Sequence, residues 1–329
     1  MNQTITCVPG LEAGHYTDLD HATGCTVFIC RDGAVGGVDV RGGSPGTRET
    51  DLLRPVHRVD RVHAVLLSGG SAFGLDAASG VMAYLADHNI GVQVGPAIVP
   101  IVPAAILFDL RLIASQVRPG PVEGRMACLA ASSEPMVEGT IGAGTGATVA
   151  KTKGFAAAVK SGIGSAVIQL PEGPLVAAAV AVNAYGGVYD YKSGQLIAGP
   201  RTDDGLGFDD PVEYLLRYGI PEESPTQESP TLENTSIGVV ATDAALTKEQ
   251  ANYLATVSHD GLALTIRPCH TDRDGDTMFA LATGRYSREV DLTRLGTAAV
   301  EATAQAVLRA VRTATGLGGV PAALEVPHA

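Results

Sequence analysis

Residues 234–242 read Asn234-Thr-Ser-Ile-Gly-Val-Val-Ala-Thr242, a pattern typical of a strand that is buried on both faces. The preceding residues 218–234 are rich in proline and acids, cannot bury a core, and are predicted to form a linker. An accessible loop that runs into a structured element tolerates a backbone cut. If the Asn234–Thr235 bond were cut, Thr235 would carry a hydroxyl nucleophile and a free amine base on one residue.

Two plainer interpretations of this junction remain open. Thr235 is also a common type of residue at the start of a strand, because its β-branched side chain favours extended backbone. The triplet Asn234-Thr235-Ser236 matches a glycosylation sequon, which requires secretion. The first residues show no charged segment followed by an apolar run, so we expect no signal peptide and a cytoplasmic protein.

Composition narrows the possible partners. The 329 residues carry a net charge of −12, only 5% aromatic residues and no tryptophan. A chain that is acidic and poor in aromatic residues is not expected to bind nucleic acid.

The most apolar stretch, residues 90–107, contains three prolines, so no membrane span is expected. The five cysteines form no CxxC pair, so we expect neither a disulfide framework nor a metal site, and we interpret each cysteine as a small buried hydrophobe.

Short β-rich runs alternate with fewer helical patterns along the chain. Adjacent runs joined by glycine-containing turns favour antiparallel hairpins, and the whole favours stacked sheets flanked by helices over a doubly wound fold. The predicted strands are 26–30, 35–40, 64–67, 156–159, 166–170, 176–183, 235–242 and 278–283. The predicted helices are 74–88, 247–263, which begins with a Thr247–Gln250 capping box, and 291–315.

The segment His270-Thr-Asp-Arg-Asp-Gly-Asp276 contains the best candidate acids. Asp274 and Asp276 flank a glycine at the entrance of a strand, so both carboxylates can project from one tight turn. Two such carboxylates can hold an ammonium group and orient a hydroxyl. A solvated Asp-Gly turn is an equally simple interpretation. A calcium loop is disfavoured because the glycine and glutamate positions do not fit.

Three further segments contain candidate polar groups, each with a plainer alternative. Glycines in 142–151 let backbone amides approach a ligand, although the lysine at its end, Lys151, is equally typical of a solvated turn. Asn183 ends a buried strand and is either an oxyanion donor or a turn former. Ser71 lies in a strand-to-helix turn that lacks the second glycine of a nucleophile elbow, so its backbone is expected to line a pocket.

Together, these segments resemble the family of DmpA-type L-aminopeptidase/D-esterases, β-peptidyl aminopeptidases and 6-aminohexanoate-oligomer (nylon) hydrolases. The resemblance covers nearly the whole chain, and five motifs occur in the same order. They are Val38-Asp-Val-Arg-Gly-Gly-Ser-Pro-Gly-Thr-Arg-Glu-Thr50, Leu67-Ser-Gly-Gly-Ser-Ala-Phe-Gly-Leu75, Gly142-Ala-Gly-Thr-Gly146, Asn234-Thr-Ser-Ile237 and His270-Thr-Asp-Arg-Asp-Gly-Asp-Thr277.

The resemblance implies an α/β fold of the N-terminal-nucleophile type, a four-layer αββα sandwich shared with ornithine acetyltransferases. It implies one domain, 1–329, that cuts itself between Asn234 and Thr235 into 1–234 and 235–329. It also implies no cofactor, an amide substrate and a homotetramer of processed pairs. By position, Thr235 matches the nucleophile and Asn183 matches the oxyanion-side amide. Lys151 matches the lysine near the nucleophile, and Asp274 and Asp276 match the orienting acids. The residues expected to line the substrate site are Gly144, Ser71 and Phe108.

Two details bear on the branch of the family. A threonine nucleophile with an Asp-Gly-Asp motif resembles the nylon-oligomer hydrolases, whereas the β-peptidyl aminopeptidases combine serine with a Ser-x-Glu pair. Phe108 stands where members of both branches carry a tyrosine, so one hydroxyl donor is missing. The predicted function is a self-processing threonine amide hydrolase acting on linear oligoamides or short peptides. The alternatives are a β-peptidyl or D-aminopeptidase-esterase, an acyltransferase of the ornithine acetyltransferase type and a non-catalytic binding protein.

Overall fold

The computed structural model describes residues 2–114, 116–220 and 234–327. Nine strands of this described part form a mixed sheet in the order β10-β11-β14-β16-β2-β4-β7-β3, with β1 paired to β2. The strands are β1 (Glu12–Asp18), β2 (Thr23–Val40), β3 (Thr47–Arg48), β4 (Arg61–Ser68), β7 (Ala104–Ile106), β10 (Ile163–Gln169), β11 (Leu175–Ala181), β14 (Ile237–Ala244) and β16 (Thr277–Tyr286). The helices are α1 (Ala77–Asp87), α2 (Pro121–Leu129), α3 (Pro211–Tyr218), α4 (Lys248–Thr265) and α5 (Leu292–Arg312).

The long strand β2 joins two halves of this sheet. Residues 23–29 of β2 pair with β1, residues 25–29 and 34–35 pair with β4, and residues 35–40 pair with β16. The register between β2 and β4 shifts between Ile29 and Ala34, which marks the point where the strand passes from one half to the other. One half is therefore built around β2 and β4, and the other around β11, β14 and β16.

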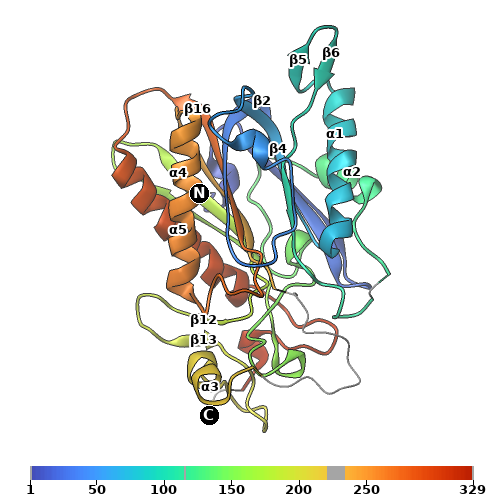
Figure 1. Ribbon diagram of the computed structural model, residues 1–329, viewed down its shortest axis with the longest axis vertical. Helices are drawn as coiled ribbons and strands as arrows, with labels where there is room; N and C mark the ends of the chain where they lie inside the picture. Colours follow the sequence, from blue (N-terminus) through green and yellow to red (C-terminus); the bar gives the residue numbers. More distant parts are fainter. Residues whose placement is uncertain (1, 115, 221–233, 328–329) are drawn as a thin grey trace.

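The two halves pack against each other through their inner faces. A single apolar cluster combines Phe28, Val65 and Leu67 of one half with Val239 and Phe279 of the other. The outer face of one half packs against α1 and α2, and the outer face of the other packs against α4 and α5. Figure 1 shows α4 and α5 on the left, α1 and α2 on the right, and the strands between them. This αββα layering confirms the predicted fold class.

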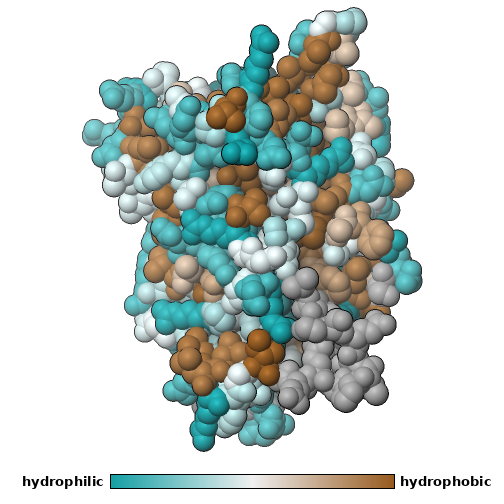
Figure 2. All heavy atoms as spheres, viewed as in Figure 1, coloured by the Kyte–Doolittle hydropathy of each residue, from teal (hydrophilic) through white to brown (hydrophobic). Residues whose placement is uncertain are grey.

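Smaller elements surround these layers. The additional strands are β5 (Val92–Val94), β6 (Ala97–Val99), β8 (Thr148–Val149), β9 (Val159–Lys160), β12 (Gly187–Tyr189), β13 (Leu196–Ala198) and β15 (Ile266–Arg267). Figure 2 shows a hydrophobic surface near the lower end of the molecule, and Figure 1 shows that α3 lies there. Leu216 of α3 is 85% exposed. Within the described residues, no helix combines the length and apolar character needed to cross a bilayer.

Most predicted elements are present, and the differences have local causes. The Thr247–Gln250 capping box forms as predicted, and α4 begins at Lys248. The separate strands predicted at 26–30 and 35–40 are wrong, because β2 continues through both. The strand predicted at 156–159 is largely a 3-10 turn, Phe155–Ala157, and the helix predicted from residue 74 begins with the 3-10 turn Ser71–Asp76. Residues 221–233 of the predicted linker lie outside the described residues.

The prediction of antiparallel hairpins is only partly correct. Two pairs in the sheet are parallel, β14 with β16 and β4 with β7. The parallel pair β14–β16 positions the candidate site because parallel strands begin at the same sheet edge. Ile237 pairs with Thr277, so the residues just before each strand lie side by side.

Candidate active site at the start of β14 and β16

Asn234 and Thr235 are buried at the edge where β14 begins. Asn234 forms a parallel bridge with Asp274, and both residues of the junction are less than 5% exposed. The Thr235 N–H donates to the Asn183 carbonyl oxygen at 2.8 Å. The carbonyl oxygen of Asn234 accepts the N–H of Gly275 at 2.9 Å and the hydroxyl of Thr235 at 2.5 Å. The hydroxyl therefore lies against the carbonyl group of the bond predicted to be cut, and a backbone donor polarises that group.

The two acids of the Asp-Gly-Asp turn hold different neighbours. Asp276 accepts the N–H of Ser236 with Oδ1 at 2.7 Å, and its Oδ2 lies 2.8 Å from His270 Nδ1. Asp276 thus fixes the residue that follows Thr235. Because β14 and β16 are parallel neighbours, the turn before β16 brings this carboxylate to the start of β14.

Asp274 is held by the turn that precedes it and by the loop after β11. Its Oδ2 accepts the N–H of Thr271 at 2.9 Å and the Thr271 hydroxyl at 2.5 Å, and its Oδ1 accepts the N–H of Tyr185 at 3.3 Å. Burial and the neighbouring Asp276 carboxylate raise the pKa of Asp274 to about 6, while these hydrogen bonds act in the opposite direction.

Asn183 and Lys151 form a connected pair beside the junction. Asn183 Oδ1 accepts Lys151 Nζ at 2.8 Å and the N–H of Thr148 at 3.0 Å. The side-chain amide of Asn183 donates to the Phe108 carbonyl oxygen at 3.0 Å, while its main-chain carbonyl accepts the Thr235 N–H. Lys151 thus contacts the residue that holds the Thr235 backbone.

The three residues expected to line the substrate site have different surroundings. Phe108 borders a small cavity together with Thr148, Lys151 and Phe155. Gly144 is packed against β10, since an added Cβ would meet the Ile163 nitrogen at 2.2 Å, and its carbonyl accepts Lys160 Nζ. Ser71 has a φ of 54°, and its N–H donates to Leu107 next to Phe108. A contact between Phe108 and Asn183 connects that cavity to the junction, and the proposed roles of Gly144 and Ser71 stay predictions.

A buried pair of charged residues was not found from the sequence. Asp109 accepts the Gly70 N–H and the Thr23 hydroxyl, each at 2.8 Å, and burial raises the pKa of Asp109 to about 6. Lys160 donates to the carbonyl oxygens of Gly144, Ala147 and Ser161, and burial lowers the pKa of Lys160 to about 7. Asp109 follows Phe108 directly and borders the same cavity. Neither Asp109 nor Lys160 lies in a motif that marks it as buried.

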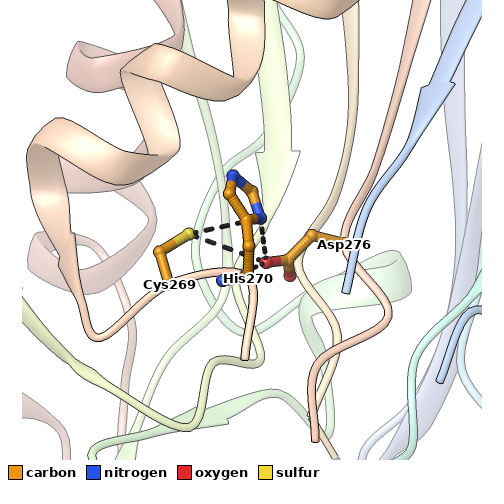
Figure 3. Close-up of side chains that lie close together, drawn as sticks. All are labelled: Cys269, His270 and Asp276. Carbon is orange, nitrogen blue, oxygen red and sulfur yellow. Dashed lines mark hydrogen bonds and ion pairs between the residues drawn. The ribbon is translucent and has the colours of Figure 1, made fainter. Parts of the chain in front are cut away.

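The cysteines are not all buried hydrophobes. Cys25, Cys30 and Cys128 are buried as expected, but Cys7 and Cys269 are partly exposed. Cys269 lies beside His270 and Asp276, with ligand-type atoms of all three within 4.8 Å of one another (Figure 3). Burial and the neighbouring carboxylates raise the pKa of the Cys269 thiol. The CxxC pattern does not describe this cluster, because Cys269 and His270 are adjacent and Asp276 lies in the turn just before β16.

Comparison with known proteins identifies the fold type and the family of the chain. A solved structure of an L-aminopeptidase D-Ala-esterase/amidase from Ochrobactrum anthropi, described as a variant of the Ntn hydrolase fold, matches with a TM-score of 0.70 and 20% identity, covering 97% of this chain and 88% of that one. A Burkholderia sp. beta-aminopeptidase matches with a TM-score of 0.66 and 23% identity, covering 98% and 90%. At these identities the likeness concerns the fold alone, which agrees with the αββα layers.

Sequence relatives extend over the same length. An "uncharacterized aminopeptidase" of Mycobacterium leprae (strain TN) is 42% identical over 350 residues, which cover 97% of this chain and 92% of the relative. A 6-aminohexanoate-oligomer endohydrolase of Kocuria sp. (strain KY2) is 28% identical over 317 residues, covering 92% and 84%. The model of peptidase family S58 matches residues 3–323. The chain therefore belongs to peptidase family S58, and it is a hydrolase that acts on amide bonds.

Proposed function

We propose that the chain is a self-processing amide hydrolase whose nucleophile is Thr235, released by cleavage of the Asn234–Thr235 bond. The observation that carries the proposal is the position of the Thr235 hydroxyl, which lies 2.5 Å from the Asn234 carbonyl oxygen. The same oxygen accepts the N–H of Gly275. A backbone donor aimed at a carbonyl oxygen stabilises the negative charge that develops there when a nucleophile attacks.

Self-cleavage would proceed in two steps. Thr235 Oγ1 attacks the carbonyl carbon of Asn234, the C–N bond breaks, and the hydroxyl proton ends on the nitrogen of Thr235. Residue 234 is then attached to Oγ1 as an ester. Water adds to the ester carbon, the C–O bond breaks, and the products are the Asn234 carboxylate and a Thr235 with free amine and hydroxyl. Both segments stay in one domain, since β14 remains paired to β11 and β16.

The mature site would use the Thr235 amine as its base. The amine takes the Oγ1 proton as Oγ1 attacks the carbonyl carbon of an amide substrate, and the proton passes to the leaving amine. Water then hydrolyses the acyl-threonine ester. Asn183 and Lys151 would position the residue, and Asp274 and Asp276 would hold the amine. The scheme requires no metal or organic cofactor.

We further propose linear oligoamides or short peptides as the substrate class. The support is the family membership together with relatives named aminopeptidase and 6-aminohexanoate-oligomer endohydrolase. Phe108, which borders the cavity, offers an apolar ring and no hydroxyl to a bound acyl group. A panel of peptide, β-peptide and ω-amino-acid oligomer amides, assayed on processed protein, would identify the preferred backbone. Transfer of the acyl group to an added amine in preference to water would identify an acyltransferase instead.

Substitution of the nucleophile tests the proposal. Wild-type protein is expected to give two bands on a denaturing gel, and N-terminal sequencing should read Thr-Ser-Ile-Gly for the smaller one. Thr235→Ala should stay as one full-length chain without amidase activity, while Thr235→Ser should still be processed. Processing of Thr235→Ala would refute the scheme. The predicted tetramer of processed pairs can be checked on the same samples by light scattering.

A further inference from the structure

Cys269, His270 and Asp276 converge on one point beside the start of β14. Cys269 Sγ lies 3.6 Å from His270 Nδ1 and 3.6 Å from Asp276 Oδ2, and the latter two atoms are 2.8 Å apart. Figure 3 shows the thiol, the imidazole and the carboxylate turned toward one another. These are three different metal-ligand groups brought together from the turn that precedes β16.

The two separations that involve Cys269 Sγ match the face of a tetrahedral zinc site. With zinc bonds of about 2.3 Å to sulfur and about 2.0–2.1 Å to nitrogen, tetrahedral angles place the two ligand atoms about 3.6 Å apart. That is the separation of Cys269 Sγ and His270 Nδ1. The contact between His270 and Asp276 is shorter because a hydrogen bond joins them, and a bound ion would replace its proton.

The surroundings hold each group in place. Asp276 Oδ1 is occupied by the N–H of Ser236, which leaves Oδ2 toward the cluster. His270 has a φ of 56°, a left-handed backbone conformation that is costly for a non-glycine residue, and its ring packs edge-on against His259 with centroids 4.8 Å apart. This packing restrains the orientation of the His270 ring. The His270 side chain is 18% exposed and the Asp276 side chain 3%, so the cluster lies just beneath the surface.

We propose that Cys269 Sγ, His270 Nδ1 and Asp276 Oδ2 bind one Zn²⁺ ion, with a solvent molecule as the fourth ligand. The thiolate and the carboxylate balance the two charges of the ion. On binding, the thiol proton leaves to solvent, and the imidazole stays neutral as its proton moves from Nδ1 to Nε2. A thiolate and an imidazole favour zinc, whereas Ca²⁺ and Mg²⁺ prefer oxygen ligands.

The proposed zinc site shares Asp276 with the proposed active site, but zinc binding does not depend on the proposed catalysis. It needs neither cleavage of the Asn234–Thr235 bond nor a substrate, and the ion performs no step of the amide hydrolysis. Binding can therefore fail while processing is normal, or succeed in a chain that is never cleaved.

Cobalt provides a spectroscopic probe for the test. The full chain is freed of metal with a chelator and titrated with Co²⁺, and Zn²⁺ is then added. We expect one equivalent of Co²⁺ per chain, a thiolate-to-cobalt charge-transfer band, tetrahedral absorption in the visible range and loss of both on zinc addition. Wild-type protein without a stoichiometric thiolate band would overturn the proposal.

Variants assign the ligands. Cys269→Ser should lose the charge-transfer band, and His270→Gln should weaken zinc binding about 100-fold or more, since even outer-shell changes cost about 10–100-fold. Cys7→Ser is the matched control, because Cys7 is a partly exposed thiol outside the cluster, and it should bind like wild type. A band that persists in Cys269→Ser, or that disappears in Cys7→Ser, would contradict the assignment. If Cys269→Ser fails to fold, the wild-type spectrum and the His270→Gln variant still show whether the cluster binds the metal ion.

Discussion

The backbone N–H of Gly275 donates a 2.9 Å hydrogen bond to the carbonyl oxygen of Asn234. This bond joins the Asp274–Asp276 turn to the junction in front of β14. In the proposed self-cleavage, it places a fixed donor at the oxygen that would gain negative charge when Thr235 attacks. The turn therefore has two kinds of contact near the junction, since the Asp276 side chain accepts the N–H of Ser236 and the Gly275 backbone faces the Asn234 carbonyl group.

Gly275→Ala is expected to impair self-cleavage. An added Cβ would lie 2.3 Å from the Ser44 carbonyl oxygen, so the turn must shift and the bond to Asn234 must lengthen. Loss of one oxyanion donor slows acyl transfer by about 100–1000-fold. The rate can be followed as disappearance of the full-length band after translation. Gly207→Ala is the control, because nothing lies within 4 Å of its added Cβ, and equal rates for the two variants would contradict the role of Gly275.

Amide hydrolysis should rise as pH increases through about 6, where Asp274 loses its proton. Thr271→Val should move this acidic limb to higher pH. The Thr271 hydroxyl donates to Asp274 Oδ2, and this bond favours the ionised form, so its loss raises the pKa of Asp274 further. The measurement is a pH–rate profile on processed protein. Thr313→Val, which removes a surface hydroxyl bonded to Arg309, should leave the limb in place.

Lys151→Met is expected to slow processing more than Lys151→Arg does. Lys151 Nζ donates to Asn183 Oδ1, and Asn183 accepts the Thr235 N–H, so loss of the cation loosens the residue that fixes the nucleophile. A reduction of about tenfold or more is expected for loss of a charge-assisted hydrogen bond. Lys153→Met provides a nearby control, since Lys153 pairs with Asp203 and Asp209. Normal processing of Lys151→Met would exclude this role.

Lys160→Met should change how stability depends on pH. Burial lowers the pKa of Lys160 to about 7 in the folded chain, below its value in the unfolded chain. Between about pH 7 and 10 the unfolded state binds the additional proton, so this lysine makes the free energy of unfolding rise with pH. The rise should be about 1 kcal/mol or more, since one pKa unit corresponds to about 1.4 kcal/mol.

Urea unfolding of wild type and Lys160→Met at pH 7 and pH 9 measures this difference. The variant should lack the additional gain in stability at pH 9. Lys192→Met, at a side chain that is 67% exposed, should keep it. Parallel pH dependence in wild type and Lys160→Met would show that Lys160 titrates normally in the folded chain.

The sequence predicts the layered fold and the main candidate residues because ordered motifs identify the family. The same reasoning misses Gly275, whose contribution comes from a backbone N–H and not from a side chain. It also separates residues 26–30 from 35–40, because a polar Arg31-Asp32-Gly33 segment resembles a turn, although β2 continues through it with two exposed residues. Gly144 lies in a motif, yet its close contact with β10 depends on tertiary packing that spacing along the chain does not contain.

The strand order has a consequence for how the protein is assembled. β14 and β16, both from residues 235–329, lie between β11 and β2, both from residues 1–234. Neither segment made alone would have a complete sheet, since each would expose unpaired strand edges to aggregation. Two separately translated polypeptides with these boundaries should remain insoluble when made apart and should reach a common native structure only when co-expressed. In the proposed scheme, folding would therefore come before scission.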